Sequence, residues 1–380
     1  MKILILGCNG GTDLAYGGGA QVATAMAHCL EKSGYKVYLL SLIGLDRERL
    51  VKVHGFSIGK NVHIRFAIDA RTKPKIPYSV ALRKVRELNS FLLKIKPDLI
   101  IYHDDIPKSF HNIVKQFKIP TVLYIHFSYW VRQRIPWHNM KMVEWSPLEA
   151  LMNYVSIDYL LENPAEADIV ITNSRATKRV TRVFVDREDI IVLNPPVRAI
   201  KRVHYRKPLL FLHAGRQDRT FLERELLVVI KSLLKKYRNA IVIINRNKSR
   251  KLFKLSLKLS RLYAIEKLDA RVWSRVLDLV RYYIHFKWFE GYGIATAEAT
   301  LRGAIPIVYR SPFNGSWTDI AVASPYCSFQ TAEEALNNVE ELESNPQKRK
   351  FISDSLIKKL SMNTIDSFCK KLINVIRSMA

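Results

Sequence analysis

The chain reads Glu290-Gly291-Tyr292-Gly293-Ile294-Ala295-Thr296-Ala297-Glu298 at the end of a short apolar run. Residues 280–286 are mainly aliphatic and aromatic, as expected for a buried strand. Residues 294–302 carry small and apolar side chains in a pattern typical of a helix, and Gly303 is placed to end it. The stretch therefore predicts a strand-to-helix turn with a carboxylate on either side.

This turn has the residue types of a binding site for a ligand that carries phosphate and several hydroxyl groups. Gly291 and Gly293 let the backbone approach a ligand closely, and the amides that open the next helix present partial positive charge to a phosphate. Glu298 can accept two hydrogen bonds from neighbouring hydroxyls, as on a ribose, and Glu290 can reach a second hydroxylated group. The alternative is that Glu290 only favours a helix N-terminus.

Length and composition predict a globular protein of two domains. A chain of 380 residues exceeds the usual size of one hydrophobic core, and 48% apolar with 25% charged residues is typical of folded proteins. No apolar run approaches the roughly 18 residues of a membrane span, and residues 2–7 fit a first buried strand better than a signal peptide. We therefore expect a cytoplasmic protein.

The four cysteines, Cys8, Cys29, Cys327 and Cys369, are far apart in the sequence and form no Cys-x-x-Cys motif. This spacing indicates neither a disulfide framework nor a metal site. We expect reduced cysteines that serve as packing residues, and no bound metal.

Short apolar runs alternate with helical stretches, which is the pattern of parallel β-α-β units. Consecutive prolines at residues 195 and 196, followed by a basic stretch, interrupt this pattern because they continue neither a helix nor a central strand. We expect two doubly wound, Rossmann-like α/β domains, 1–197 and 198–380, that face each other across a cleft, with the last helix packing back on the first domain. The expected strands are residues 3–6, 37–41, 62–67, 99–102, 122–126, 169–172, 190–193, 209–213, 241–245, 262–265, 280–286 and 305–309.

The formal net charge of +27 is unevenly distributed, because residues 201–261 contain 18 Lys or Arg against three acidic residues. Such a field attracts nucleic acid, anionic lipid or phosphorylated substrates. Within this region Leu252, Leu255 and Leu259 recur at helical spacing, so the favoured interpretation of residues 248–261 is an amphipathic helix packed on a sheet. The chain carries no zinc, RNP or helix-turn-helix signature, which disfavours a nucleic-acid-binding protein.

Three further segments are expected at the carboxyl ends of strands, where ligands bind in such sheets. Gly17-Gly18-Gly19 comes immediately before a predicted helix over residues 20–32, so its backbone can cradle a phosphate. Arg216 and Arg219 follow the first strand of the second domain, and guanidinium groups suit bidentate phosphate contacts, with solvated surface arginines as the alternative. His126 ends a central strand, where it serves either as hydrogen-bonded scaffolding or as a catalytic group.

Taken together, these residues resemble a known family. The chain is similar to the retaining, nucleotide-sugar-dependent glycosyltransferases of family 4, which have the GT-B fold. The resemblance runs nearly from end to end and is most specific in the two glutamates of the turn, spaced as E-x7-E. It also includes the glycines at 17–19, residues 167–174, the linker at 194–197 and Gly215-Arg216.

The resemblance implies that Glu298 binds the ribose of the donor nucleotide, that Glu290 contacts the donor sugar and that Arg216 holds the diphosphate. His126 would orient the sugar or the acceptor. Transfer needs little covalent help from the protein, because a nucleoside diphosphate leaves readily once its charge is neutralised. No D-x-D motif is present, which supports a metal-independent site without a cofactor. The other expected donor-binding residues are Gly18, Gly19, Arg219, Gly291, Tyr292, Gly293 and Ile294.

Two departures from the family pattern concern the donor site. The family usually has a lysine some five residues after the arginine, where this chain has Phe221, so Arg219 or Arg224 is the expected substitute. Residues 245–247 also stand where many relatives have a glycine-rich turn, so recognition of the base does not carry over.

A narrower similarity concerns the acceptor. Residues 303–309 with 315–320, and residues 124–128, resemble mannosyltransferases that extend lipid-linked oligosaccharides, which implies a glycan or polyprenyl-linked acceptor and a UDP- or GDP-linked hexose donor. Residues 129–137 and 141–145 mix aromatic and basic side chains, as peripheral membrane anchors do, with an acceptor-binding loop or domain core as the alternative. A nucleotide-sugar epimerase or a phosphorylase of the same fold remains a further alternative.

Overall fold

The structure is a computed structural model, which describes residues 1–7, 13–70, 90, 93–104, 111, 114–126, 166–198, 203, 207–214, 220–245, 250–265 and 270–379. The chain divides into two compact units. Unit 1 contains residues 1–173, 177–196 and 365–380, and unit 2 contains residues 174–176 and 197–364. The chain thus enters the main part of unit 2 after Pro196 and returns to unit 1 for its last helix.

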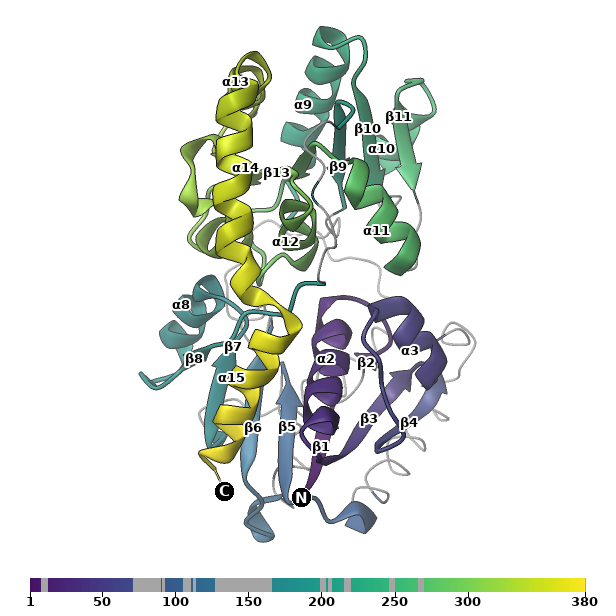
Figure 1. Cartoon of the computed structure of the whole chain (residues 1–380), viewed down its shortest axis with the longest axis vertical. Coiled ribbons are helices and arrows are strands. Elements are labelled where there is room, and N and C mark those ends of the chain that lie inside the picture. Colours follow the sequence, from purple (N-terminus) through teal and green to yellow (C-terminus); the bar gives the residue numbers. More distant parts are fainter. Residues whose placement is uncertain are drawn as a thin grey trace. The chain divides into compact units, whose positions relative to one another are not determined.

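Unit 1 is built on a parallel sheet that has eight strands in the described part of the chain. Its strand order is β2-β3-β1-β5-β6-β7-β8, and β4 pairs with β3 (Figure 1). The strands β1 to β8 span Lys2–Leu6, Asp13–Leu14, Lys36–Gly44, Val62–Asp69, Leu99–His103, Thr121–Ile125, Ile169–Thr172 and Ile191–Val192. The helices α2, α3, α8 and α15 span Gly18–Lys32, Arg47–His54, Arg175–Phe184 and Ile365–Arg377.

The middle strands of this sheet consist almost entirely of buried side chains. Every residue of β5 and β6 is buried, and in β1 only Lys2 is exposed. Strands that are covered on both faces have no polar face, which explains continuous apolar runs such as residues 122–125. The register pairs Ile3 with both Val37 and Leu99, so the apolar runs lie side by side.

Unit 2 is built on a second parallel sheet, with six strands among the described residues, in the order β11-β10-β9-β12-β13-β14. The strands β9 to β14 span Leu210–His213, Ile241–Asn245, Leu262–Ile265, Tyr282–His285, Ile305–Tyr309 and Ser328–Phe329. The helices α9 to α14 span Glu223–Lys236, Arg250–Ser256, Ala270–Leu279, Ile294–Leu301, Ala332–Ser344 and Pro346–Leu360. A π-helix spans Ser316–Ile320, and short 3-10 turns span Ala321–Ala323, Pro325–Cys327 and Ser361–Asn363.

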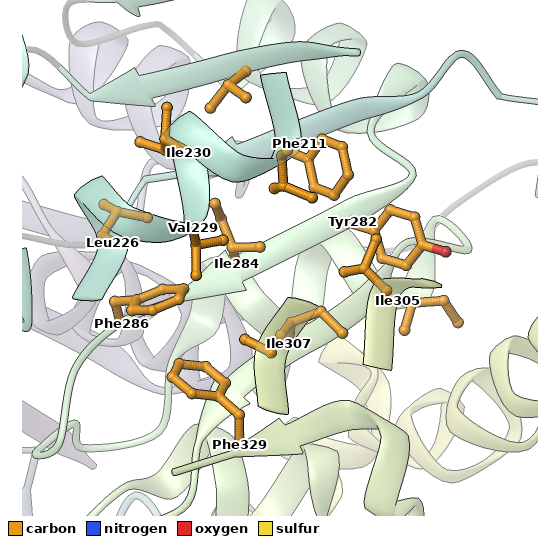
Figure 2. Packing of buried hydrophobic residues seen from close by; sticks show 14 of the residues in the cluster. Phe211, Leu226, Val229, Ile230, Tyr282, Ile284, Phe286, Ile305, Ile307 and Phe329 are labelled. Atoms are coloured by element: carbon orange, nitrogen blue, oxygen red, sulfur yellow. The ribbon is translucent and has the colours of Figure 1, made fainter. Parts of the chain in front are cut away.

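A core cluster of unit 2 packs helices α9, α13 and α14 against the strands of its sheet. Figure 2 shows Leu226, Val229 and Ile230 of α9 beside aromatic and aliphatic side chains of the strands. Phe211 stacks on Tyr282 with ring centres 5.2 Å apart. Burial of one such side chain contributes about 1.5–3 kcal/mol, so this cluster holds the strands whose carboxyl ends carry the candidate site.

All of the strands expected from the sequence are present, so the prediction of two parallel-sheet α/β domains is confirmed. The two-residue strands β2 and β14 were not expected, because two residues show no periodicity. The amphipathic interpretation of residues 248–261 is confirmed for α10, although this helix already ends at Ser256. Leu252 is buried in the core, whereas Lys251 and Lys254 are exposed.

Helix α15 packs against α2 within unit 1 (Figure 1). A disulfide joins Cys29 of α2 to Cys369 of α15. The expectation of reduced packing cysteines is therefore wrong for this pair. The two residues are 340 positions apart, and only the return of the chain to unit 1 brings them together. Cys327 is free, and its burial raises the pKa of its thiol to about 12. Cys8 lies outside the described residues.

Within the described ranges, no helix combines the length and the apolar character that crossing a membrane requires. The aromatic and basic segments at 129–137 and 141–145, which were predicted to be interfacial anchors, lie outside those ranges.

Candidate functional site

Glu290 follows β12 in a loop that is tied to a neighbouring segment. Its N–H donates to the carbonyl of Phe313 (3.1 Å), and its own carbonyl accepts from the N–H of Gly315 (2.9 Å). The side chain of Asn314, which is fully buried, donates to the carbonyl of Lys287 (2.8 Å). These bonds fix the backbone on both sides of Glu290.

Gly293 makes the turn from this loop into α12. It is the N-cap of the helix with φ 82° and ψ 59°, a left-handed conformation that is costly for any residue with a Cβ. A Cβ at this position would also overlap Oγ of Ser316. No side chain of the described residues caps the helix here, so the first amides of α12 are available to an anion.

Glu298 lies on α12, and its carboxylate is almost completely buried, with 2% of the side chain exposed. Arg198 binds it with a fork: Nε donates to Oε1 (2.5 Å) and Nη2 donates to Oε2 (2.9 Å). Trp273 on α11 adds a third donor, its indole N–H to Oε2 at 2.9 Å. The residue predicted to bind ribose is thus already paired within unit 2.

The carboxylate of Glu290 is more accessible, with 26% of its side chain exposed. Oε2 lies 3.3 Å from Nζ of Lys287 and 3.6 Å from Nε2 of His285. Lys287 itself is 7% exposed, so a buried cation holds the carboxylate from the protein side. The remaining surface of Glu290 can accept hydrogen bonds from hydroxyl groups of a ligand.

Tyr283 of β12 is a buried phenol. Burial raises the pKa of this phenol well above its ordinary value, and the negative charges of Glu290 and Glu298 raise it further. The group therefore stays a neutral hydroxyl. Along the chain, Glu290 follows β12 in the loop and Glu298 lies on α12, which begins at Ile294.

Strand β9 ends beside β12, and its last residue, His213, is buried. Its Nδ1 donates to the carbonyl of Ile284 (2.9 Å), and burial lowers the pKa of the ring to about 3. Phe221 stacks on this ring with centres 5.1 Å apart and pairs with Lys287 in an antiparallel bridge. Bridge partners lie within reach of each other's side chains. The ammonium group of Lys287 therefore lies beside position 221, although it comes from the opposite segment.

Other predicted phosphate contacts are only partly described. Gly215, Arg216 and Arg219 lie outside the described residues, whereas Arg224 is exposed on α9. In unit 1, Gly18 and Gly19 form the first turn of α2, after Gly17 with φ 93°. No acidic residue lies in that first turn, so no side chain of the turn offsets the partial positive charge at the N-terminus of the helix.

His126 follows β6 in unit 1 and is held in a buried pair. Its Nε2 lies 3.1 Å from Nδ1 of His103, so one ring donates and the other accepts. The N–H of His126 donates to the carboxylate of Asp104 (2.5 Å). Burial lowers the pKa of both rings well below the ordinary histidine value. The pair is neutral near pH 7, and its geometry suits the scaffolding alternative as well as a neutral hydrogen-bonding role.

Sequence reasoning missed three residues around the turn: Arg198, Trp273 and Lys287. Lys287 precedes Glu290 by three positions, and that spacing beside a carboxylate was a usable signal. Arg198 and Trp273 are 100 and 25 positions from Glu298, and no local pattern connects them. In the described part of the chain, no group of three His, Cys, Asp or Glu residues is placed to hold a metal ion.

Residues 16–199 match the family model described as Glycosyltransferase Family 4. No curated protein sequence matches this chain. The matched range ends before the turn at 290–298, so the family match and the turn are separate observations.

Solved structures with the same fold align over the whole chain. Sucrose-phosphate synthase from Thermosynechococcus elongatus is 13% identical, with 100% of this chain and 99% of that chain covered and a TM-score of 0.70. WaaG, a glycosyltransferase involved in lipopolysaccharide biosynthesis, is 13% identical over 99% of both chains, with a TM-score of 0.69. HepE of Anabaena in complex with UDP-glucose is 13% identical over 100% of both chains, with a TM-score of 0.66. The fold of this chain is that of the GT-B glycosyltransferases.

Proposed function

We propose that this protein is a retaining, metal-independent glycosyltransferase that moves a hexose from a nucleotide sugar to a glycan or polyprenyl-linked acceptor. The observation that carries the proposal is the turn at 290–298, which places two carboxylates and an uncapped helix N-terminus at the end of β12. The match of residues 16–199 to a glycosyltransferase family model and the GT-B fold support it.

In this proposal each part of the turn has one task. The first amides of α12 bind a donor phosphate, and the predicted contact from Arg216 adds a guanidinium to it. Both neutralise the charge that develops on the departing nucleoside diphosphate, which lowers the barrier to cleavage of the bond between sugar and phosphate. We also propose that the transferred hexose keeps its anomeric configuration.

Glu290 binds hydroxyl groups of the donor sugar. Its carboxylate is partly exposed toward the ligand and is held from behind by Lys287 at 3.3 Å. This arrangement orients the carboxylate, so that it accepts hydrogen bonds from the sugar without rearrangement. Lys287 is then a positioning residue for Glu290.

The test is a transfer assay with purified protein, UDP- and GDP-linked hexoses, and a panel of glycans and polyprenyl-diphosphate glycans, with and without EDTA. NMR of the product gives the anomeric configuration. Glu290→Gln should lower kcat by 100-fold or more, on the order of one lost transition-state contact. Glu333→Gln, an exposed glutamate on α13, is the matched control and should leave transfer unchanged.

The outcomes separate the alternatives. Conversion of the donor sugar without any acceptor would indicate an epimerase instead. Full activity in Glu290→Gln would refute the assignment of the turn. Tight, salt-sensitive binding of nucleic acid without turnover of any nucleotide sugar would refute the glycosyltransferase function itself.

A further inference from the structure

Arg198 lies at the start of the main part of unit 2, next to Val197 and after the two prolines at residues 195 and 196. We propose that Arg198 occupies the ribose-binding oxygens of Glu298 in the ligand-free protein and is displaced when a nucleotide binds. It thereby sets both the affinity for the nucleotide and the discrimination between ribose and deoxyribose. This proposal rests on the proposed function, because it takes a nucleotide as the ligand of the turn.

The carboxylate of Glu298 has little free capacity. Its two oxygens offer about four acceptor positions, and three N–H donors already use them, two from Arg198 and one from Trp273. A ribose diol needs both oxygens at once. With 2% of the side chain exposed, the carboxylate cannot receive both hydroxyl groups while the guanidinium fork stays in place.

Of the two side chains shown to donate to Glu298 in the described part of the chain, Arg198 is the one that can leave. Trp273 is fixed in helix α11, whereas Arg198 extends from a segment without helix or strand. Its Nη1 is buried and has no hydrogen-bond partner in the described part of the chain, so the ion pair leaves one polar group of Arg198 unsatisfied. Movement of the side chain into water would satisfy that group, which lowers the cost of displacement.

The backbone supports a movement of the side chain alone. The N–H of Val197 donates to the carbonyl of Asn363 (2.9 Å), and the side chain of Asn363 donates to the hydroxyl of Tyr292 (2.9 Å). Val197 also belongs to the same buried cluster as Tyr292. The residue before Arg198 is therefore anchored to the turn itself, and the guanidinium can swing about this anchor while the chain stays in place.

The consequence is a competition that a binding experiment can measure. A ribonucleotide gains two hydrogen bonds to Glu298 but must break the bidentate ion pair, whereas a 2′-deoxynucleotide offers one hydroxyl group and binds with the ion pair in place. Arg198 thus reduces the affinity for the ribonucleotide and conceals part of the contribution of the 2′-hydroxyl. Removal of the guanidinium should reveal both effects.

The experiment is isothermal titration calorimetry at pH 8 with UDP, GDP and ADP, followed by the 2′-deoxy form of the tightest binder. Arg198→Gln removes the charge, and Arg198→Lys keeps it but has no fork. Arg275→Gln, an exposed arginine on α11, is the control. We expect both Arg198 variants to bind the ribonucleotide more tightly, by about tenfold for Arg198→Gln. We also expect a larger ratio between the deoxy and ribo dissociation constants than in the wild type or the control.

A measurement on the wild type decides the question if the variants fail to fold. The indole N–H signal of Trp273 reports on Glu298 directly, and Trp273→Phe identifies it. The ribonucleotide should shift this signal by more than its deoxy form does. Weaker binding by folded Arg198 variants, an unchanged ratio, or an indole signal that ignores the nucleotide would overturn the inference and leave the proposed function standing. Failure of all three nucleotides to bind the wild type would overturn both.

Discussion

Acidification should destabilise unit 2 through His213. The pKa of this residue is about 3 in the folded protein, against an ordinary value of 6.5, because the ring is completely buried. Between these two values the unfolded chain binds a proton that the folded chain does not bind. Stability is therefore fully present above pH 6.5 and is lost progressively as the pH falls from 6.5 toward 3.

The size of the effect follows from the two pKa values. Each pH unit below 6.5 costs about 1.4 kcal/mol per buried neutral histidine, so a change from pH 7.5 to pH 5.0 should lower the free energy of unfolding by about 2 kcal/mol through His213 alone. The pKa values of His103 and His126 in unit 1 are lowered by burial too, and they add to the loss with the same sign.

The assay is urea unfolding at pH 7.5, 6.0 and 5.0 for the wild type and for His213→Asn. An asparagine amide can still donate to the carbonyl of Ile284, but it does not titrate. The variant should lose about 2 kcal/mol less than the wild type between pH 7.5 and pH 5.0. His63→Asn, at an exposed position, is the control and should follow the wild type. Identical pH slopes for the wild type and His213→Asn would refute the reasoning.

Three further predictions concern the stability of the site and its surroundings. Arg198→Met and Glu298→Gln should each lower the free energy of unfolding by about 3 kcal/mol, because each leaves a buried charged group without its partner. The double variant should lose clearly less than the sum of the two losses. Additive losses in urea titrations would exclude a coupled ion pair. Gly293→Ala should cost at least about 1–2 kcal/mol because of its positive φ, and an unchanged urea midpoint would contradict that geometry. Reduction of the bond between Cys29 and Cys369 should lower stability by about 2–5 kcal/mol; thermal melts with and without reductant that coincide would show that this bond contributes nothing.

Local sequence patterns were sufficient for most of the fold. Parallel strands that are buried on both faces consist of continuous apolar runs in the sequence. The boundary between the domains is marked by the consecutive prolines at residues 195 and 196. The turn at Gly293 could also be predicted from local sequence, because a position with positive φ at the start of a helix favours glycine. Short elements such as β14 have no period and could not be found.

Contacts between distant segments explain what the sequence did not reveal. Glu298 was recognised as an acidic residue of the turn, but its pairing with Arg198 depends on the linker passing beside α12. The Cys29 and Cys369 disulfide likewise depends on α15 returning to unit 1. His126 was identified by its position, while its hydrogen bond to His103 depends on the adjacent strand.

Thermal unfolding with UDP-glucose, GDP-mannose and ADP-glucose tests the central claim most directly, with wild type and Glu290→Gln side by side. A nucleotide sugar at about 100 times its dissociation constant adds roughly 2.7 kcal/mol to the free energy of unfolding. We expect one donor to raise the melting temperature of the wild type clearly and that of Glu290→Gln much less. No stabilisation by any of the three, or equal stabilisation of the variant, would contradict a nucleotide-sugar site at residues 290–298.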